Sequence, residues 1–195
     1  MTRRVVITGI GAVSPNGIGR ENFGRACREG RSGISALTID TTGLRSSVAG
    51  AAKDFDPTGV MDAVELRRVP RMVPMALSAS REAFEQAGLP VSGIDVGLAR
   101  RIGVSLGTGG GGLAFVEDQY RTFFTSGTGS LFSITAGTHG NLSSELSIAL
   151  GLRGPSHVLS TGCTSSTDAI GYAMLLIRAG VVPMMLAGGA DAPIS

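Results

Sequence analysis

The segment 157–178 places one cysteine between a short apolar run and a long apolar stretch. Residues 157–160 have the composition of a short strand, and residues 161–163 interrupt it with a turn. The residues after Cys163 are small and polar, of the types that begin helices: Thr164, Ser165, Ser166, Thr167 and Asp168. Residues 169–177 are almost all apolar, which predicts a helix buried on every side. The pattern therefore predicts strand, sharp turn and buried helix, with Cys163 at the turn.

The start of a helix is a favourable position for a reactive cysteine. Unpaired backbone N–H groups and the helix dipole stabilise a thiolate there. The same N–H groups can bind the oxyanion that forms when a thiolate attacks a carbonyl. We therefore interpret Cys163 as a nucleophile that accepts an acyl group, with its own backbone N–H in an oxyanion hole. The alternative is a buried structural cysteine. The local sequence GCTSS also differs from the G-x-S-x-G elbow of serine hydrolases.

Several stretches resemble segments of the β-ketoacyl synthases, in the same order along the chain. STGCTSSTDAIGYAMLLIRAG, which contains Cys163, resembles the active-site segment of that family. Five other stretches resemble further family segments: VVITGIGAVSPNGIG, REGRSGI, RRVPRMVPMALSASREAFEQAGL, IGVSLGTGGGGL and MLAGGADAPIS. The resemblance extends over the whole chain, and it is strongest to the ketosynthase subunit of bacterial type II polyketide synthases.

This resemblance implies an α/β fold of the thiolase type, in which two similar halves stack as α/β/α/β/α layers. Residues 1–195 would form the N-terminal half, with Cys163 as the nucleophile. The resemblance assigns two decarboxylating histidines, a supporting lysine and a glycine-rich loop to the C-terminal half, which is absent from this sequence. One half alone would leave an apolar helix uncovered. We expect either a fragment of a longer protein or a second chain that supplies the other half.

The resemblance also implies an acyltransferase of fatty acid or type II polyketide synthesis. An acyl carrier protein would deliver the acyl group on its phosphopantetheine thiol, and condensation with malonyl-carrier protein would follow. No bound cofactor and no metal are expected. We expect a homodimer or heterodimer, completed by a C-terminal ketosynthase half or a homologous subunit and active only when so completed.

Three other functions fit parts of the pattern. A non-catalytic subunit like the chain-length factor of type II systems would shape the acyl pocket, but it would carry another residue in place of Cys163. A thiolase or chalcone-synthase-like enzyme would use coenzyme A, whereas the ADAPIS ending fits the carrier-dependent group better. A dinucleotide site at Gly9 and Gly11 is disfavoured because Ser14 stands where that fingerprint needs its third glycine.

The composition indicates a globular protein of unexceptional charge. Hydrophobic residues make up 43% and charged residues 16% of the chain, and the formal net charge is +2. This balance gives no argument for binding nucleic acid or an anionic membrane. Cys27 and Cys163 form neither a disulfide framework nor a zinc pattern, so we expect a reducing, cytoplasmic location. No apolar run has the form of a signal peptide or the length of a membrane span.

The hydrophobic pattern predicts the other elements as well. Strands are expected at residues 3–10, 102–106, 157–160 and 180–186, and helices at 20–30, 63–88, 113–125 and 138–150. Residues 33–57 are expected to form a loop with short strands. Cys27 and the aromatic residues between positions 113 and 132 are expected in the core.

Three polar or flexible features remain. The five glycines within residues 107–112 lack the Lys-Ser/Thr of a phosphate-binding loop, so we expect them to permit close backbone contact. His139 and His157 have no spacing that indicates a base for the Cys163 thiol. The cluster of Arg67, Arg68 and Arg71 is interpreted as a solvated face; the functional alternative is a basic patch for an acidic carrier protein.

Overall fold

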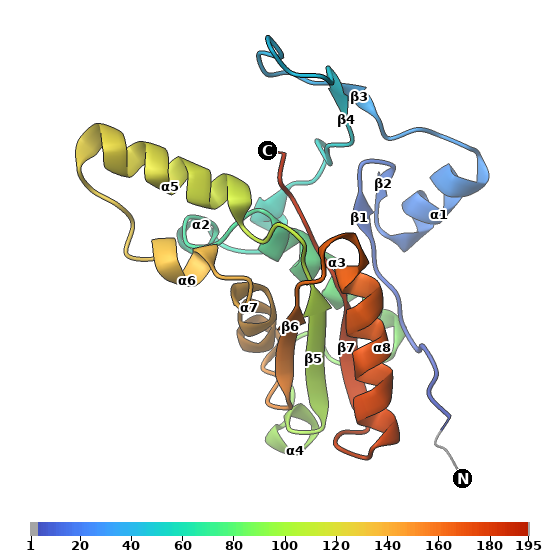
Figure 1. Ribbon diagram of the computed structural model, residues 1–195. Coiled ribbons are helices and arrows are strands. Elements are labelled where there is room, and N and C mark those ends of the chain that lie inside the picture. The colour runs from blue at the N-terminus through green and yellow to red at the C-terminus, as the bar shows by residue number, and fades with distance from the viewer. Residues whose placement is uncertain (1–3, 195) are drawn as a thin grey trace.

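A parallel sheet lies at the centre of the computed structural model, which describes residues 4–194 (Figure 1). The sheet has three strands, β5 (Ile102–Gly107), β6 (Ser156–Leu159) and β7 (Met184–Gly189), in the order β6-β5-β7. Every residue of β5 is buried, as expected for a central strand covered on both faces. Because all three strands are parallel, their carboxyl ends meet at one edge of the sheet.

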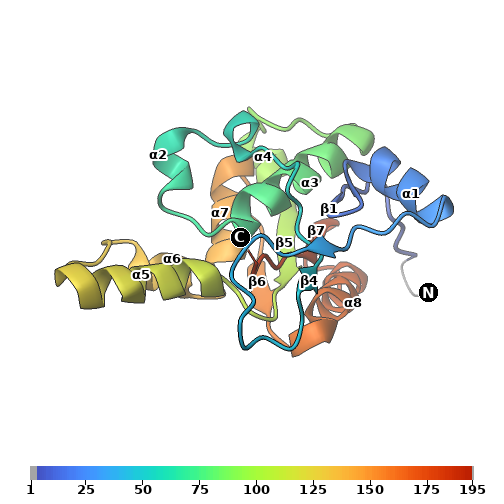
Figure 2. The same cartoon turned by 90° about the horizontal axis from the view of Figure 1, so that it is seen from above.

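Helices cover both faces of this sheet and give the molecule three layers (Figure 2). On one face α3 (Met72–Gln86) packs with α7 (Asn141–Leu150), and on the other face lies α8 (Ser165–Arg178). The core between β5 and the first pair of helices contains Leu77, Phe84, Ile102, Val104, Leu142, Leu146 and Leu150. The α/β class predicted from the sequence is confirmed.

Helix α8 is covered on one side only. Ser165, Ala169 and Ala173 are buried, whereas Ile170 and Leu175 are 49% and 57% exposed. The prediction of a helix buried on every side is therefore wrong for this chain, because residues 4–194 supply no layer beyond α8. An apolar stripe of this kind in water favours association with another protein surface.

The segment before residue 13 is not the strand predicted at residues 3–10, of which residue 3 lies outside the described part. Residues 4–10 are irregular, and Val6 and Ile7 are 61% and 79% exposed. The segment runs along α3, where the backbone N–H of Ile10 donates to Gln86 Oε1 at 2.8 Å. The Gln86 side chain of α3 thus provides the hydrogen-bond acceptor that a neighbouring strand would provide in a sheet.

Gly9 and Gly11 allow this segment to touch the backbone of α3. A Cβ atom at Gly9 would lie 1.9 Å from the carbonyl oxygen of Ala83, and one at Gly11 would lie 1.9 Å from that of Ala79. Only glycine fits such an approach. Close packing on a helix therefore accounts for the G-x-G pair, in agreement with the rejection of a dinucleotide site.

The helix predicted at residues 63–88 is two helices. Helix α2 (Ala63–Leu66) ends before Pro70, and α3 begins after it. Proline has no N–H to donate and disfavours helical backbone in the residue before it, so the two helices are separate. Gly88 follows α3 with φ of +69°, which is the predicted stop.

The remaining elements include the helices predicted near residues 20–30 and 113–125 and the short strands expected within residues 33–57, and the other short elements were not predicted from the sequence. The remaining elements are β1 (Val13–Ser14), β2 (Gly17–Ile18), α1 (Arg20–Arg28), β3 (Ser35–Ala36), β4 (Val48–Ala49), η1 (Pro57–Gly59), α4 (Val96–Ala99), α5 (Leu113–Ser126), α6 (Ser133–Gly137) and η2 (Gly162–Thr164). Strand β7 begins four positions later than predicted. Cys27 is exposed, so its predicted place in the core is wrong; the buried residue of α1 is its neighbour Ala26. Among residues 4–194, no helix combines the length and apolar character needed to cross a bilayer.

Helices α5 and α6 form an arm that projects from the body in both views (Figures 1 and 2). No residue of α5 is buried. Tyr120 and Phe123 pack on Phe124, which is itself 80% exposed. The prediction that these aromatic residues fill the core is wrong, because the arm has no layer to pack against within the described residues.

The contact between Gly11 and α3 generates a stability prediction. Gly11→Ala forces a methyl group into the Ala79 carbonyl and should lower the free energy of unfolding by about 1–3 kcal/mol. Gly24→Ala is the matched control, because its Cβ would lie 3.5 Å from the flexible end of Arg28 and alanine favours a helix. Urea unfolding monitored by circular dichroism measures both variants. Equal stability of the two variants would contradict the close contact.

Candidate functional site

Three loops meet at the carboxyl edge of the sheet. The glycine loop (residues 108–112) follows β5, the turn that contains Cys163 follows β6, and the segment around Asp191 follows β7. In open parallel sheets, ligands bind outside this edge. The edge is therefore the candidate functional site of the chain.

Cys163 lies in η2, immediately before the first turn of α8, and is exposed. The chain reverses at Gly162, whose φ is +69°. This is the strand-turn-helix position predicted from the sequence, with the positive end of the helix dipole close by. The alternative of a buried structural cysteine therefore does not hold for Cys163.

Ser165 braces the turn from the inside. It is buried, and its Oγ accepts a hydrogen bond from the backbone N–H of Thr161 at 2.9 Å. The same hydroxyl donates to the carbonyl oxygen of Gly162 at 2.6 Å and lies 3.3 Å from that of Thr108. One side chain thus joins both ends of the turn to the glycine loop.

Asp168 braces the turn from the outside. Its Oδ2 accepts hydrogen bonds from the hydroxyl groups of Thr161 and Thr164, the second at 3.2 Å. A carboxylate in the first turn of a helix also interacts favourably with the helix dipole. The turn around Cys163 is therefore held by hydrogen bonds on two sides.

The amide groups of the glycine loop are bound by Asp191. Its Oδ1 accepts hydrogen bonds from the Thr108 hydroxyl and the Gly110 N–H, and its Oδ2 accepts one from the Gly109 N–H, each at 2.9 Å. The N–H of Gly111 donates to Thr108 Oγ1 at 3.0 Å. Amides that a phosphate-binding loop would offer to its ligand are thus satisfied within the chain, in agreement with the sequence interpretation.

The same loop lies in close contact with the Cys163 turn and α8. A Cβ atom at Gly109 would lie 3.2 Å from the carbonyl oxygen of Gly162, and one at Gly107 would lie 2.2 Å from the carbonyl carbon of Ser165. The predicted role of these glycines in close backbone contact is confirmed.

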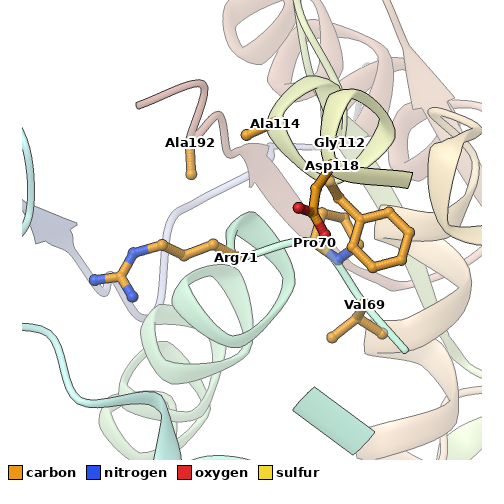
Figure 3. Close-up of a pocket in the computed structure, with 8 residues that line it drawn as sticks. Val69, Pro70, Arg71, Gly112, Ala114, Asp118 and Ala192 are labelled. Carbon is orange, nitrogen blue, oxygen red and sulfur yellow. The ribbon is translucent and has the colours of Figure 1, made fainter. Parts of the chain in front are cut away.

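A small hollow adjoins the glycine loop on the side of the arm (Figure 3). It has a volume of about 210 Å³, and its lining includes Val69, Pro70, Phe115 and Asp118 together with Gly112 and Ala192 of two site loops. The Arg71 side chain points away from Pro70 and Asp118, and it donates to the carbonyl oxygen of Ala52 at 3.0 Å. The hollow is smaller than the roughly 300–1,000 Å³ of typical ligand pockets, so we assign no ligand to it.

The two histidines are engaged in packing. His157 lies edge-to-face on Tyr172, with ring centroids 5.5 Å apart. His139 lies against the glycine loop, where a Cβ atom at Gly111 would be 3.3 Å from its Cδ2. The described part of the chain holds no group of three His, Cys, Asp or Glu side chains that could bind a metal ion.

Sequence reasoning identified Cys163 but missed Thr108, Ser165 and Asp191. Each is the first or second polar residue beyond the end of a strand or at the start of α8. This position could have indicated from the sequence that the three residues lie close together, because the carboxyl ends of parallel strands share one edge of the sheet. The pairing itself joins residues 82 positions apart and has no local signature.

The sequence matches the family described as "Beta-ketoacyl synthase, N-terminal domain" over residues 2–195. The chain belongs to the β-ketoacyl synthase family. The resemblance identified from the sequence motifs is thereby confirmed.

Relatives of both fatty acid and polyketide type are similar to this family member. The 3-oxoacyl-[acyl-carrier-protein] synthase 2 of Coxiella burnetii (strain RSA 493 / Nine Mile phase I) is 34% identical over 192 residues, which are 97% of this chain and 46% of the relative. The putative polyketide beta-ketoacyl synthase 1 of Streptomyces halstedii is 38% identical over 207 residues, covering 100% of this chain and 48% of the relative. The chain thus spans about half the length of the curated relatives it matches.

A solved structure described as the ishigamide ketosynthase/chain length factor has the same fold. It superimposes with a TM-score of 0.85 at 30% sequence identity, over 98% of this chain and 48% of that chain. The thiolase-like ketosynthase fold expected from the sequence is confirmed for the layers that this chain contains.

The inner brace generates a second stability prediction. Ser165→Ala leaves the Thr161 N–H without its acceptor and should cost about 1–3 kcal/mol of unfolding free energy. Thr167→Ala, an exposed substitution two positions along the same helix, should change stability by less than about 0.5 kcal/mol. Chemical unfolding of both variants tests the difference. A Ser165→Ala variant as stable as Thr167→Ala would show that the brace is not needed.

Proposed function

We propose that this chain is the nucleophile-bearing half of a β-ketoacyl-[acyl carrier protein] synthase, with residues 1–195 as one N-terminal domain. The observation that carries the proposal is the exposed Cys163 thiol at the start of α8, on a turn held by Ser165 and Asp168. The similarity to 3-oxoacyl-[acyl-carrier-protein] synthases supports an acyltransferase of fatty acid or type II polyketide synthesis.

The first step is acyl transfer to Cys163. The Sγ atom attacks the thioester carbonyl of an acyl group carried on the phosphopantetheine thiol of an acyl carrier protein. A C–S bond to Cys163 forms, the C–S bond to phosphopantetheine breaks, and the leaving thiolate takes up the proton that the Cys163 thiol lost. The backbone N–H of Cys163 stabilises the tetrahedral oxyanion between these two events.

Condensation follows in two further steps. Malonyl-carrier protein loses CO₂ as its C–C bond breaks, and the resulting carbanion attacks the Cys163 thioester. A new C–C bond forms, the C–S bond to Cys163 breaks, and a β-ketoacyl chain two carbons longer remains on the carrier. Resemblance to the family assigns the histidines for decarboxylation to the second half, so these steps require that half.

The partner that supplies the second half would cover α8. The outward face of this helix carries Ile170 and Leu175, both largely exposed in the chain alone. A C-terminal ketosynthase half, or a homologous subunit, would bury this stripe and complete the layered fold. The exposed aromatic residues of the arm provide a second apolar surface for a homodimer or heterodimer.

The carrier protein would be held by charge as well as by its phosphopantetheine. Arg67 and Arg68 are exposed, and the guanidinium of Arg68 lies 5.3 Å from the Phe132 ring centroid. Arg71 is instead occupied by backbone carbonyl groups. The first two arginines are therefore the part of the basic cluster available to an acidic carrier.

The second candidate function is a non-catalytic subunit like a chain-length factor. The similarity to a solved ketosynthase/chain length factor structure supports this alternative. A thiol at position 163 favours the catalytic subunit, because a purely pocket-shaping subunit has no use for a nucleophile there.

An acylation assay distinguishes these functions. Incubation with acyl-carrier protein should add one acyl group to Cys163, detected by mass spectrometry of peptides from the protein. Cys163→Ala should abolish the adduct, whereas Cys27→Ser, which changes the other exposed cysteine, should retain it. Iodoacetamide should likewise label Cys163 faster than Cys27. An intact but unacylated Cys163 would favour the chain-length-factor alternative, and acylation only from coenzyme A thioesters would favour the other enzyme class.

Condensation provides a separate prediction. Residues 1–195 alone, given acyl- and malonyl-carrier protein, should form no β-ketoacyl product, because the decarboxylating histidines that the resemblance assigns to the second half are not among them. Co-expression with a C-terminal ketosynthase half should restore the product, read as the mass of the carrier-bound chain. Product from the purified chain alone would show that the second half is not required.

A further inference from the structure

We infer that Asp191 is a positioning residue that sets the direction of the Cys163 backbone N–H through the glycine loop. The inference deepens the proposed function, because it concerns how the nucleophile turn is prepared for acyl transfer. It rests on a chain of contacts that crosses from β7 to β5 and then to the turn after β6.

The first link is the pairing of β7 with β5. Gly189 pairs in parallel register with Gly107, and the N–H of Ala190 continues the ladder by donating to the Gly107 carbonyl at 3.0 Å. This extra hydrogen bond places Asp191 directly beside residues 108–110. The position of its carboxylate is therefore fixed by the sheet rather than by a flexible tail.

The second link is the carboxylate itself. Both oxygens are used, Oδ1 by Thr108 and Gly110 and Oδ2 by Gly109. Three donors converge on one side chain, so the backbone of the loop has one preferred position. An amide of the same size at position 191 would retain a single acceptor oxygen and present an N–H₂ group to an N–H donor.

The third link runs from the loop to the turn through Ser165, whose Oγ lies 3.3 Å from the Thr108 carbonyl oxygen. Gly109 lies beside the Gly162 carbonyl, so close that a Cβ atom there would be 3.2 Å from its oxygen. That carbonyl also accepts hydrogen bonds from the backbone N–H and the Oγ of Ser165. Its oxygen is thus held by two donor groups of Ser165. The Gly162–Cys163 peptide is planar and trans, so its N–H points opposite to its C=O. Because the Gly162 carbonyl oxygen lies beside the glycine loop, the Cys163 N–H points away from that loop.

Asp191→Asn tests this inference by comparing two reactions of the same sulfur atom. Acyl transfer passes through an oxyanion, whereas alkylation by iodoacetamide does not. We expect the acyl-transfer rate constant to fall by at least about tenfold, part of the roughly hundredfold that loss of one oxyanion donor costs. The alkylation rate constant should change by less than about twofold. Asp54→Asn, an exposed matched substitution, should change neither rate.

A second pair of variants tests the route through Thr108. Thr108→Val removes the hydroxyl that donates to Asp191 and accepts from Gly111, and it should reproduce the selective loss of acyl transfer. Thr108→Ser keeps that hydroxyl and should restore the rate.

Equal loss of acylation and alkylation in Asp191→Asn would indicate a general structural defect and overturn the inference. Unchanged acylation would overturn it as well.

Hydrogen exchange separates this inference from the proposed function. In Asp191→Asn, the amides of residues 160–165 should exchange faster than in the parent protein, together with those of residues 108–112. Faster exchange confined to residues 108–112 would show that the loop does not hold the turn. If the parent protein accepts no acyl group, the proposed catalytic function fails, whereas the exchange pattern still decides whether Asp191 positions Cys163.

Discussion

Parallel pairing of β5 with β6 on one side and β7 on the other is the constraint on which the site depends. It brings the glycine loop, the Cys163 turn and Asp191 to one edge, although these segments are far apart in the chain. A slip of one residue between β5 and β7 would move Asp191 away from the Gly109 and Gly110 amides and reverse the faces of the strand. The absence of a side chain at Gly107 then lets α8 lie directly on β5, with Cys163 at its start.

Sequence reasoning succeeded where one element carries its own signal. The helix predicted at residues 138–150 is present, and its leucines with helical spacing, Leu142, Leu146 and Leu150, are buried in the core. The order of strand, polar turn and apolar helix likewise located the Cys163 turn. Sequence reasoning failed at residues 4–10, because a strand-like composition does not specify which neighbouring strand the segment would pair with. The Asp191 contacts were also not predictable, since they follow from sheet register rather than from any local pattern.

The errors at α8 and the arm share a physical cause. An apolar composition indicates that a segment is buried in the complete protein assembly. It does not indicate that residues 4–194 themselves bury that segment. The outward face of α8 and the aromatic residues of α5 are exposed in this chain for want of a covering layer. These surfaces are the expected binding faces of the second half and of a dimer partner in the proposed assembly.

The capture of glycine-loop amides by Asp191 has a consequence for the chemistry of the edge. A run of glycines with convergent N–H groups ordinarily recruits an external anion such as a phosphate or a nucleotide. Here the protein provides its own permanent counter-anion, from a residue 82 positions away. The loop amides are thereby closed to an external anion, and the loop can serve as a fixed support for the neighbouring turn.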